Sequence, residues 1–224
     1  MNLLADALAW VADPGNWLGA SGIWVRLGQH LAIALVVLLI ASAVALPAGV
    51  AVGHTRRGHG VVAAIAGAAR AVPTLGLLTL LGLLMGIGLK APVIVLVVLA
   101  IPPLLAGAYS GVANVDVTAV KAARALGMSE WQIVRGVELP LASPVIMGGV
   151  GSAALQVVAT ATLAAYVADA GLGRFIFSGL SARRYDEMLG GAILVILLAL
   201  FVDLAFHLAI KVSERHARRS TGLA

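Results

Sequence analysis

The sequence contains no cysteine and little charge. Without cysteine the chain forms no disulfides and lacks the thiolate ligands of most structural metal sites. Charged residues occupy only 11% of the 224 positions, whereas a soluble domain carries about 25%. Hydrophobic residues reach 61%, so the composition predicts an integral membrane protein. The net charge of +5 is then explained by basic loops on the cytoplasmic side of the membrane, and we expect no binding to nucleic acid.

Lysine is also scarce, and its positions exclude one ATP-binding motif. The chain has only Lys90, Lys121 and Lys211, and none of them precedes Ser or Thr. A P-loop ends in Lys followed by Ser or Thr, so the chain lacks this element. His54 and His59 have no acidic or thiol neighbour in the sequence, and we expect no metal site. We predict no catalytic residues and no cofactor on this chain.

Residues 1–29 are predicted to be a surface segment outside the membrane. Leu4, Leu8 and Val11 repeat at helical spacing, and the run Asp13–Asn16 (Asp-Pro-Gly-Asn) ends that pattern. The segment has no basic region or cleavage site of a signal peptide. Three aromatic residues suit a membrane–water interface: Trp10, Trp17 and Trp24.

Five apolar runs predict five membrane-spanning helices: residues 31–52, 71–89, 91–112, 145–167 and 188–210. Each has the roughly 20 residues that are needed to cross about 30 Å of hydrocarbon. Pro47 predicts a kink, and Pro102 with Pro103 predicts an interruption near mid-membrane. Starting the second span at Ala71 keeps Arg70 at the interface and leaves residues 60–69 as a helical lead-in.

The basic residues favour one orientation of these spans. With the N-terminus outside, ten of the fifteen Lys and Arg residues lie inside: Arg56, Arg57, Arg70, Lys121, Arg124, Arg135, Lys211, Arg215, Arg218 and Arg219. The C-terminus then lies inside. The predicted organisation is an extracytoplasmic segment (1–29), a transmembrane domain (30–215) and a basic cytoplasmic tail (216–224).

Residues 114–144 are too polar for hydrocarbon, and this topology places them in the cytoplasm. Asp116 is a suitable N-cap for a helix to about Leu126, which Gly127 ends in the left-handed conformation. The run Ser129–Gln132 has the S-x-x-Q pattern of a capping box and starts a second helix, which we expect Pro140 to stop. The pattern predicts a two-helix knob that either docks onto a partner or folds back onto its own helices.

A polar stripe follows on an otherwise apolar helix. Gly148, Ser152, Gln156 and Thr160 are spaced four residues apart, with Thr162 beside them. Such a stripe either lines a translocation pathway or forms hydrogen bonds between helices. The residues alone leave both interpretations open.

The knob sequence resembles the EAA loop of ABC importer permeases, E-A-A-x3-G-x9-I-x-L-P. Here the loop reads Lys121-Ala-Ala-Arg-Ala-Leu-Gly127, then nine residues, then Val137-Glu-Leu-Pro140. Lys121 replaces the glutamate and Val137 replaces the isoleucine of the pattern. In that family the loop inserts into a cleft of the ATP-binding subunit. The resemblance implies that these residues couple the chain to an ATPase: Lys121, Ala122, Ala123, Arg124, Gly127, Met128, Trp131, Val137, Leu139 and Pro140.

Other segments resemble the permeases of glycine betaine, choline and carnitine importers, namely residues 159–165, 170–173 and 175–180. The resemblance implies an all-α, methionine-importer-like type I permease fold in the bacterial inner membrane, with alternating access driven by a separate ATPase that holds ATP and magnesium. The implied partners are this ATP-binding subunit, an extracytoplasmic substrate-binding protein, a second permease subunit and membrane lipid.

Two other functions remain open. The methionine-importer permeases share the fold, so a permease for methionine or another amino acid is one alternative. An ion-coupled secondary transporter is another, but it needs ionisable residues at mid-membrane, and the predicted spans offer no convincing one.

Overall fold

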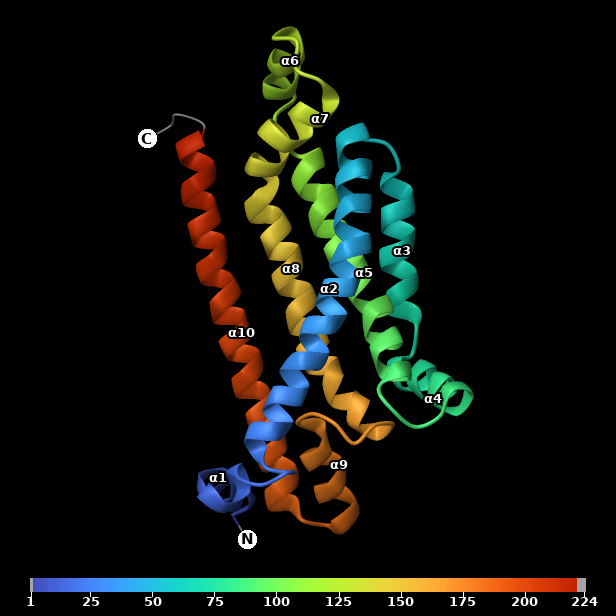
Figure 1. The fold of residues 1–224 in the computed structure, drawn as a ribbon, viewed down its shortest axis with the longest axis vertical. Coiled ribbons are helices and arrows are strands. Elements are labelled where there is room, and N and C mark those ends of the chain that lie inside the picture. The colour runs from blue at the N-terminus through green and yellow to red at the C-terminus, as the bar shows by residue number, and fades with distance from the viewer. Residues whose placement is uncertain (1, 221–224) are drawn as a thin grey trace. The chain divides into compact units, whose positions relative to one another are not determined.

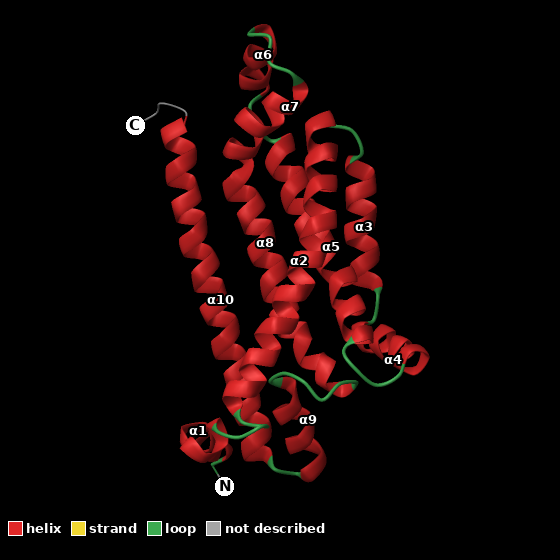
Figure 2. Ribbon diagram, in the orientation of Figure 1, coloured by secondary structure: helices red, strands yellow, loops and turns green. Residues whose placement is uncertain are grey.

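Helices form all the regular structure in the computed structural model, which describes the backbone of residues 2–220 and the side chains of residues 2–68 and 71–212 (Figure 2). The side chains of Arg70 and of the predicted basic tail, residues 216–224, lie outside this described part of the chain. The all-α prediction is therefore confirmed for the described residues.

Within the described residues, four helices are long and apolar enough to cross a membrane. They are drawn in Figure 1 as α2 (Ile23–Thr55), α5 (Lys90–Ala113), α8 (Leu139–Ala161) and α10 (Tyr185–Ser220). The remaining helices are shorter: α1 (Leu3–Ala12), η1 (Pro14–Trp17), α3 (His59–Ala71), α4 (Thr74–Met85), α6 (Val117–Ala125), α7 (Glu130–Ile133), η2 (Val134–Glu138), η3 (Thr162–Tyr166) and α9 (Gly173–Ala182).

The helix in the predicted span over residues 71–89 is shorter than expected. The predicted lead-in forms α3, the chain breaks at Val72 and Pro73, and α4 covers only residues 74–85. Proline disfavours helical geometry in the residue before it and lacks the N–H that would continue the helix. α4 has 12 residues, which is only about 18 Å at 1.5 Å per residue. Gly86, with a φ of 84°, ends it.

The prolines that were expected to interrupt or stop helices lie inside them. α5 continues through Pro102 and Pro103, and Pro140 lies within the first turn of α8. Pro103 leaves the carbonyl of Leu99, four residues earlier, without its helical donor. The side-chain amide of Gln156 donates to this oxygen at 3.2 Å. A hydrogen bond between helices thus replaces the one that proline removes.

Pro140 does not stop the second knob helix either. The preceding residues form a π-helical turn, η2, in which the Leu139 N–H donates to the carbonyl of Val134. This wider turn changes the hydrogen-bond register just before the proline and lets α7 run on into α8. The prediction of a helix end at Pro140 was wrong, because sequence spacing does not reveal a π turn.

The chain divides into two compact units, and each of the four long helices contributes residues to both units. Unit 1 comprises residues 1–39, 72–99 and 154–202. One cluster in its core contains Leu78, Val95 and Leu99. Elsewhere in this unit, the ring of Trp10 lies 5.1 Å from that of Phe175 in an edge-on arrangement, which anchors α1 to α9.

Unit 2 comprises residues 40–71, 100–153 and 203–224, and small residues bring its helices close together. A Cβ added to Gly49 of α2 would lie 2.6 Å from that of Ala108 in α5. A Cβ added to Gly107 of α5 would lie 2.6 Å from the Cα of Gly149 in α8. Close backbone approach of this kind is typical of membrane helices. Gly49 of α2 and Gly107 of α5 therefore serve helix packing.

Candidate functional site

α6 begins and ends where the sequence indicates. The carboxylate of Asp116 accepts a hydrogen bond from the Thr118 N–H at 2.8 Å and caps the first turn. After the helix ends at Ala125, Gly127 adopts a φ of 82°. No atom lies within 4 Å of a Cβ added to Gly127, so the backbone conformation alone favours glycine here.

α7 starts with the predicted capping box. The Gln132 N–H donates to the Ser129 hydroxyl, and the Gln132 side chain accepts from the Ser129 N–H at 2.8 Å. α6 and α7 contact each other and, with η2, form the two-helix knob that the sequence predicts, residues 116–140 (Figure 1).

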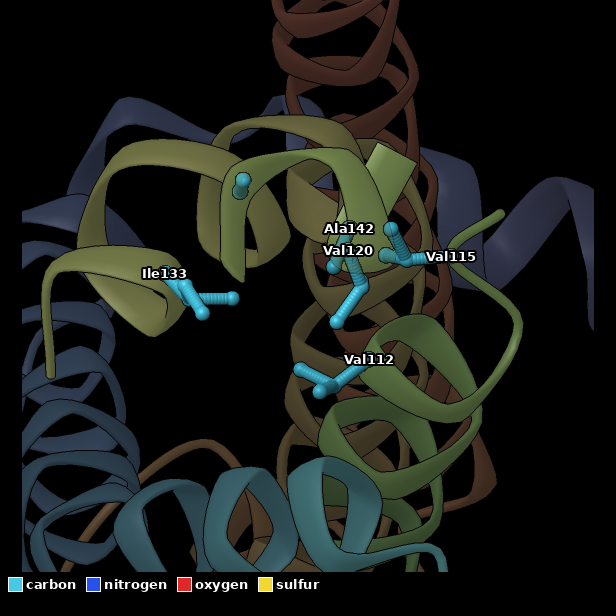
Figure 3. Close-up of a cluster of buried hydrophobic side chains, with 6 residues drawn as sticks. Val112, Val115, Val120, Ile133 and Ala142 are labelled. Carbon is cyan, nitrogen blue, oxygen red and sulfur yellow. The ribbon is translucent and has the colours of Figure 1, made fainter. Parts of the chain in front are cut away.

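The knob rests on a buried apolar cluster in unit 2. Figure 3 shows Val115, Val120 and Ala142 close together, with Val112 and Ile133 facing the same interior. Ile133 and Val112 are fully buried. The knob residues Met128 and Val137 pack against this cluster. Part of the predicted coupling sequence therefore holds the knob to the membrane helices and is not available to a partner.

An ion pair joins the two knob helices. Arg124 donates to Glu130 through Nε at 2.7 Å and Nη2 at 2.8 Å. This hydrogen-bonded contact raises the pKa of the Arg124 guanidinium above its usual range, so Arg124 stays charged. The two-pronged geometry fixes α6 relative to α7.

His54, at the end of α2, ties the membrane helices to the knob. Its Nδ1 lies 2.7 Å from Glu138 and its Nε2 lies 3.1 Å from Glu130. The Glu138 side chain is only 2% exposed, and a buried carboxylate requires such a partner. This pairing was not predicted, because 84 residues separate His54 from Glu138. Acidic partners of His54 exist after all, far away in the sequence.

A second contact holds the start of the knob. The guanidinium of Arg56 donates to the backbone carbonyl of Val115 at 2.7 Å. The C-terminal end of α2 thus contacts the chain just before α6, as well as η2 and α7 through His54. A displacement of the knob would act directly on α2.

The outer surface of the knob exposes apolar and basic side chains. Leu126 is 84% exposed and Trp131 is 69% exposed, and Lys121 also faces outward. Of the other predicted coupling residues, Ala122, Arg124 and Gly127 are exposed, Ala123 is buried, and Leu139 and Pro140 are half-buried with Met128 and Val137. Large exposed apolar side chains on a rigid support are typical of a protein-binding surface.

The polar stripe of α8 has mixed surroundings. Ser152 and Gln156 are exposed, although the Gln156 amide reaches Leu99. The Thr160 hydroxyl donates back to the Gln156 carbonyl, and that of Thr162 donates to the Ala159 carbonyl at 2.7 Å. These bonds serve the helix itself, so the stripe combines packing hydrogen bonds with exposed polar groups.

Sequence reasoning missed a set of buried polar residues early in α2. Arg26 is 5% exposed, although residues 1–29 were expected to form a surface segment. His30, the next residue after that segment, is fully buried. Arg26 pairs with Asp169, 143 residues away. α2 begins at Ile23, eight residues before the apolar run over residues 31–52. The charge of Arg26 is the reason why this early start of the helix was not predicted.

A comparison with protein families decides the class of this membrane protein. The family of binding-protein-dependent transport system inner membrane components matches residues 43–219. This match covers most of the chain, including the knob. The chain belongs to this family. It is therefore a membrane-embedded component of a binding-protein-dependent transport system.

Relatives of this inner membrane component include named permeases. It is 38% identical to the carnitine transport permease protein OpuCB of Listeria monocytogenes, over 81% of this chain and 83% of the relative. It is 32% identical to the glycine betaine/carnitine/choline transport system permease protein OpuCB of Bacillus subtilis (strain 168), over 80% of this chain and 82% of the relative.

A solved structure shows the same fold. The inner membrane component resembles a chain of the inward-facing MetNI methionine ABC transporter with a TM-score of 0.73, covering 90% of this chain and 99% of that one. The sequence identity is 23%, so this likeness concerns the fold alone. It confirms the methionine-importer-like type I permease fold.

Proposed function

We propose that this inner membrane component is the permease subunit of an ABC importer for quaternary ammonium osmoprotectants such as glycine betaine, carnitine and choline. The names of relatives with 38% and 32% identity support this substrate class. A separate ATP-binding subunit hydrolyses ATP and holds the nucleotide and magnesium. An extracytoplasmic binding protein delivers the substrate, and a second permease subunit completes the pathway.

The single observation that carries the coupling role is the exposed knob on its buried base. Leu126 and Trp131 are exposed, whereas the cluster beneath the knob, with Ile133, Val120 and Val112, is buried. A loop that merely folded back onto its own helices would bury its large apolar side chains. We therefore assign Lys121, Leu126 and Trp131 to the surface that docks into the ATPase.

Five membrane crossings fit the contacts of unit 2. The knob contacts the end of α2 through His54 and the end of α5 through Val112. Both helices therefore end on the same side of the membrane. The chain between Thr55 and Lys90 has to return to the other side before α5 begins, and α3 with α4 supplies this fifth crossing. The positive-inside rule then places the knob and C-terminus inside and the N-terminus outside.

The mechanism is alternating access between inward-facing and outward-facing populations, which ATP binding biases through the knob. Glu138 and His54 transmit the displacement to α2, and η2 transmits it to α8. The exposed side chains of Ser152 and Gln156, with Thr160 and Thr162 further along, line the route of the substrate. Because π turns are rare and are frequently found at functional sites, η2 is a suitable hinge.

Proton coupling finds no support at the buried histidine of α2. His30 Nε2 lies 3.0 Å from the Val158 carbonyl, and its Nδ1 accepts from the Leu172 N–H at 3.3 Å. Both ring nitrogens are thus occupied by backbone groups, which fixes one tautomer. A proton-coupled secondary transporter would need an ionisable group within the membrane that is free to exchange its proton.

The test is uptake by the reconstituted complex. Proteoliposomes containing the permease and its ATPase, with the binding protein outside, are supplied with radiolabelled glycine betaine, carnitine, choline or methionine. We expect ATP-dependent uptake of one or more quaternary ammonium compounds and none of methionine. Uptake of methionine alone would overturn the proposed substrate class, and uptake without ATP would overturn the proposed energy source.

A further inference from the structure

Arg26 holds Asp169 in unit 1 with two hydrogen bonds. Its Nη1 donates to the Asp169 carbonyl at 2.8 Å and its Nη2 donates to the carboxylate at 2.9 Å. Arg26 is 5% exposed, and an arginine is rarely buried unless its charge is paired. One buried side chain thus fixes both the backbone and the side chain of Asp169.

Two further residues of α2 hold the backbone that follows. Gln29 accepts a hydrogen bond from the Gly171 N–H at 3.1 Å, and His30 accepts one from the Leu172 N–H at 3.3 Å. Gly171 has a φ of 76°, and a Cβ there would lie 3.1 Å from His30 Nδ1. Most loops are mobile surface connections. Residues 169–172 are instead fixed by three side chains of one helix.

Asp169, the first residue of this fixed segment, lines a cavity of about 490 Å³. This volume lies within the range of about 300–1,000 Å³ found for small-molecule sites. Its lining combines an aromatic ring, both signs of charge and apolar side chains: Tyr166, Asp169, Arg174, Thr79, Leu83 and Ile87.

The charged groups of this cavity are held in place but remain accessible. The Asp169 side chain is 68% exposed, and Arg174 Nε lies 3.2 Å from it. No hydrogen bond within the described part of the chain occupies the terminal nitrogens of Arg174. The ring of Tyr166 is steadied by Phe177, with centroids 5.7 Å apart. The cavity therefore offers a carboxylate, a guanidinium and an aromatic face.

We infer that this cavity is a subsite for a small zwitterion in which a short chain joins a quaternary ammonium group to a carboxylate. The ammonium group lies against the Tyr166 ring and near Asp169, because aromatic faces attract cations. The carboxylate binds the free edge of Arg174, whose fork of donors matches its two oxygens. This inference rests on the proposed substrate class and places one substrate site on the permease itself.

The site is tested by equilibrium binding to the purified complex of permease and ATPase, without the binding protein. The probes are radiolabelled glycine betaine, which has both charged groups, and choline, which lacks the carboxylate. We expect saturable binding of both to the wild type. Arg174→Gln should weaken binding of glycine betaine about tenfold, the usual effect of losing a charged hydrogen bond, and change that of choline less than about twofold.

The aromatic contact is tested with a matched pair of variants. Tyr166→Leu should weaken binding of both compounds, whereas Tyr166→Phe, which keeps the ring, should retain both. Arg183→Gln removes an exposed arginine outside this cavity and should leave both affinities unchanged. Retained thermal stability and basal ATPase activity identify variants that fold and assemble.

Two outcomes would overturn the subsite: no saturable binding to the wild-type complex, or equal weakening of both compounds by Arg174→Gln. Uptake driven by the binding protein is measured in parallel with the wild type. Uptake without binding at this cavity would contradict the proposed subsite but would still support the proposed function. Absence of uptake of every quaternary ammonium compound would overturn the proposed function.

Discussion

His54 Nδ1 lies 2.7 Å from the Glu138 carboxylate, which joins the end of α2 to the π turn before α8. The Glu138 side chain is 2% exposed, so His54 compensates a carboxylate that water does not reach. The same imidazole contacts Glu130 at 3.1 Å. One side chain thus ties α2 to both α7 and η2, and it is the contact through which we expect coupling to pass.

Removing this imidazole should destabilise the permease. His54→Ala leaves the Glu138 carboxylate buried without its partner, and breaking a buried pair in this way costs about 3–5 kcal/mol. We expect a matching loss in the free energy of unfolding in detergent, followed by circular dichroism. Adding Glu138→Gln removes the uncompensated charge and should restore part of this loss. A double variant no more stable than His54→Ala would contradict the account.

Gly127 tests the backbone requirement of the knob. Gly127→Val forces a β-branched residue into the left-handed region, at a cost of roughly 1–2 kcal/mol, and should reduce ATP-driven uptake by misplacing α7. Gly127→Asn is the matched control, because asparagine tolerates this conformation. We expect Asn to retain most uptake and Val to lose it. Equal uptake by the two variants would show that transport does not depend on the left-handed backbone conformation of Gly127, with its φ of 82°.

Trp131 tests the docking surface directly. Its side chain is 69% exposed, so Trp131→Ala should leave the melting temperature unchanged. We expect it to weaken co-purification of the ATPase about tenfold or more, as loss of a central aromatic residue does at protein interfaces. Trp24→Ala removes another exposed tryptophan, in unit 1, and serves as the control. Equal co-purification with both variants would exclude Trp131 from the interface.

The polar stripe of α8 is suited to thiol labelling, because the chain contains no cysteine. Ser152→Cys and Gln156→Cys should react with a water-soluble maleimide if these positions line the route. Leu200→Cys places a thiol at an exposed apolar position of α10, and there we expect no reaction in a lipid environment. Substrate with its binding protein should slow labelling at the two α8 positions. Labelling of Leu200→Cys alone would assign the stripe to helix packing.

Local signals in the sequence predicted the knob well. The caps at Asp116 and Ser129 and the left-handed Gly127 depend on chemistry within a few residues, and all three are present. The span at residues 71–89 was predicted from hydropathy, which does not register that Pro73 breaks the helix. Pro103 was expected to interrupt α5, but Gln156 satisfies the Leu99 carbonyl that it frees.

The contacts that connect the site were not predictable from spacing. His54 meets Glu138 across 84 residues, and Arg26 meets Asp169 across 143. Single-sequence patterns carry information about the nearest turns of a helix, and these pairs depend on tertiary packing. The burial of Arg26 was missed for the same reason. A charged residue just before an apolar run is usually interpreted as lying at the membrane interface.

Cross-linking from the knob tests the central claim most directly. Leu126 is 84% exposed. Because the chain contains no cysteine, the Leu126→Cys variant has a single thiol. A photoactivated cross-linker is attached to this thiol in the assembled transporter. We predict a covalent adduct between the permease and the ATP-binding subunit, with a yield that changes when ATP is added. Adducts only with lipid or within the permease chain itself would contradict the assignment of the knob as the ATPase-docking element.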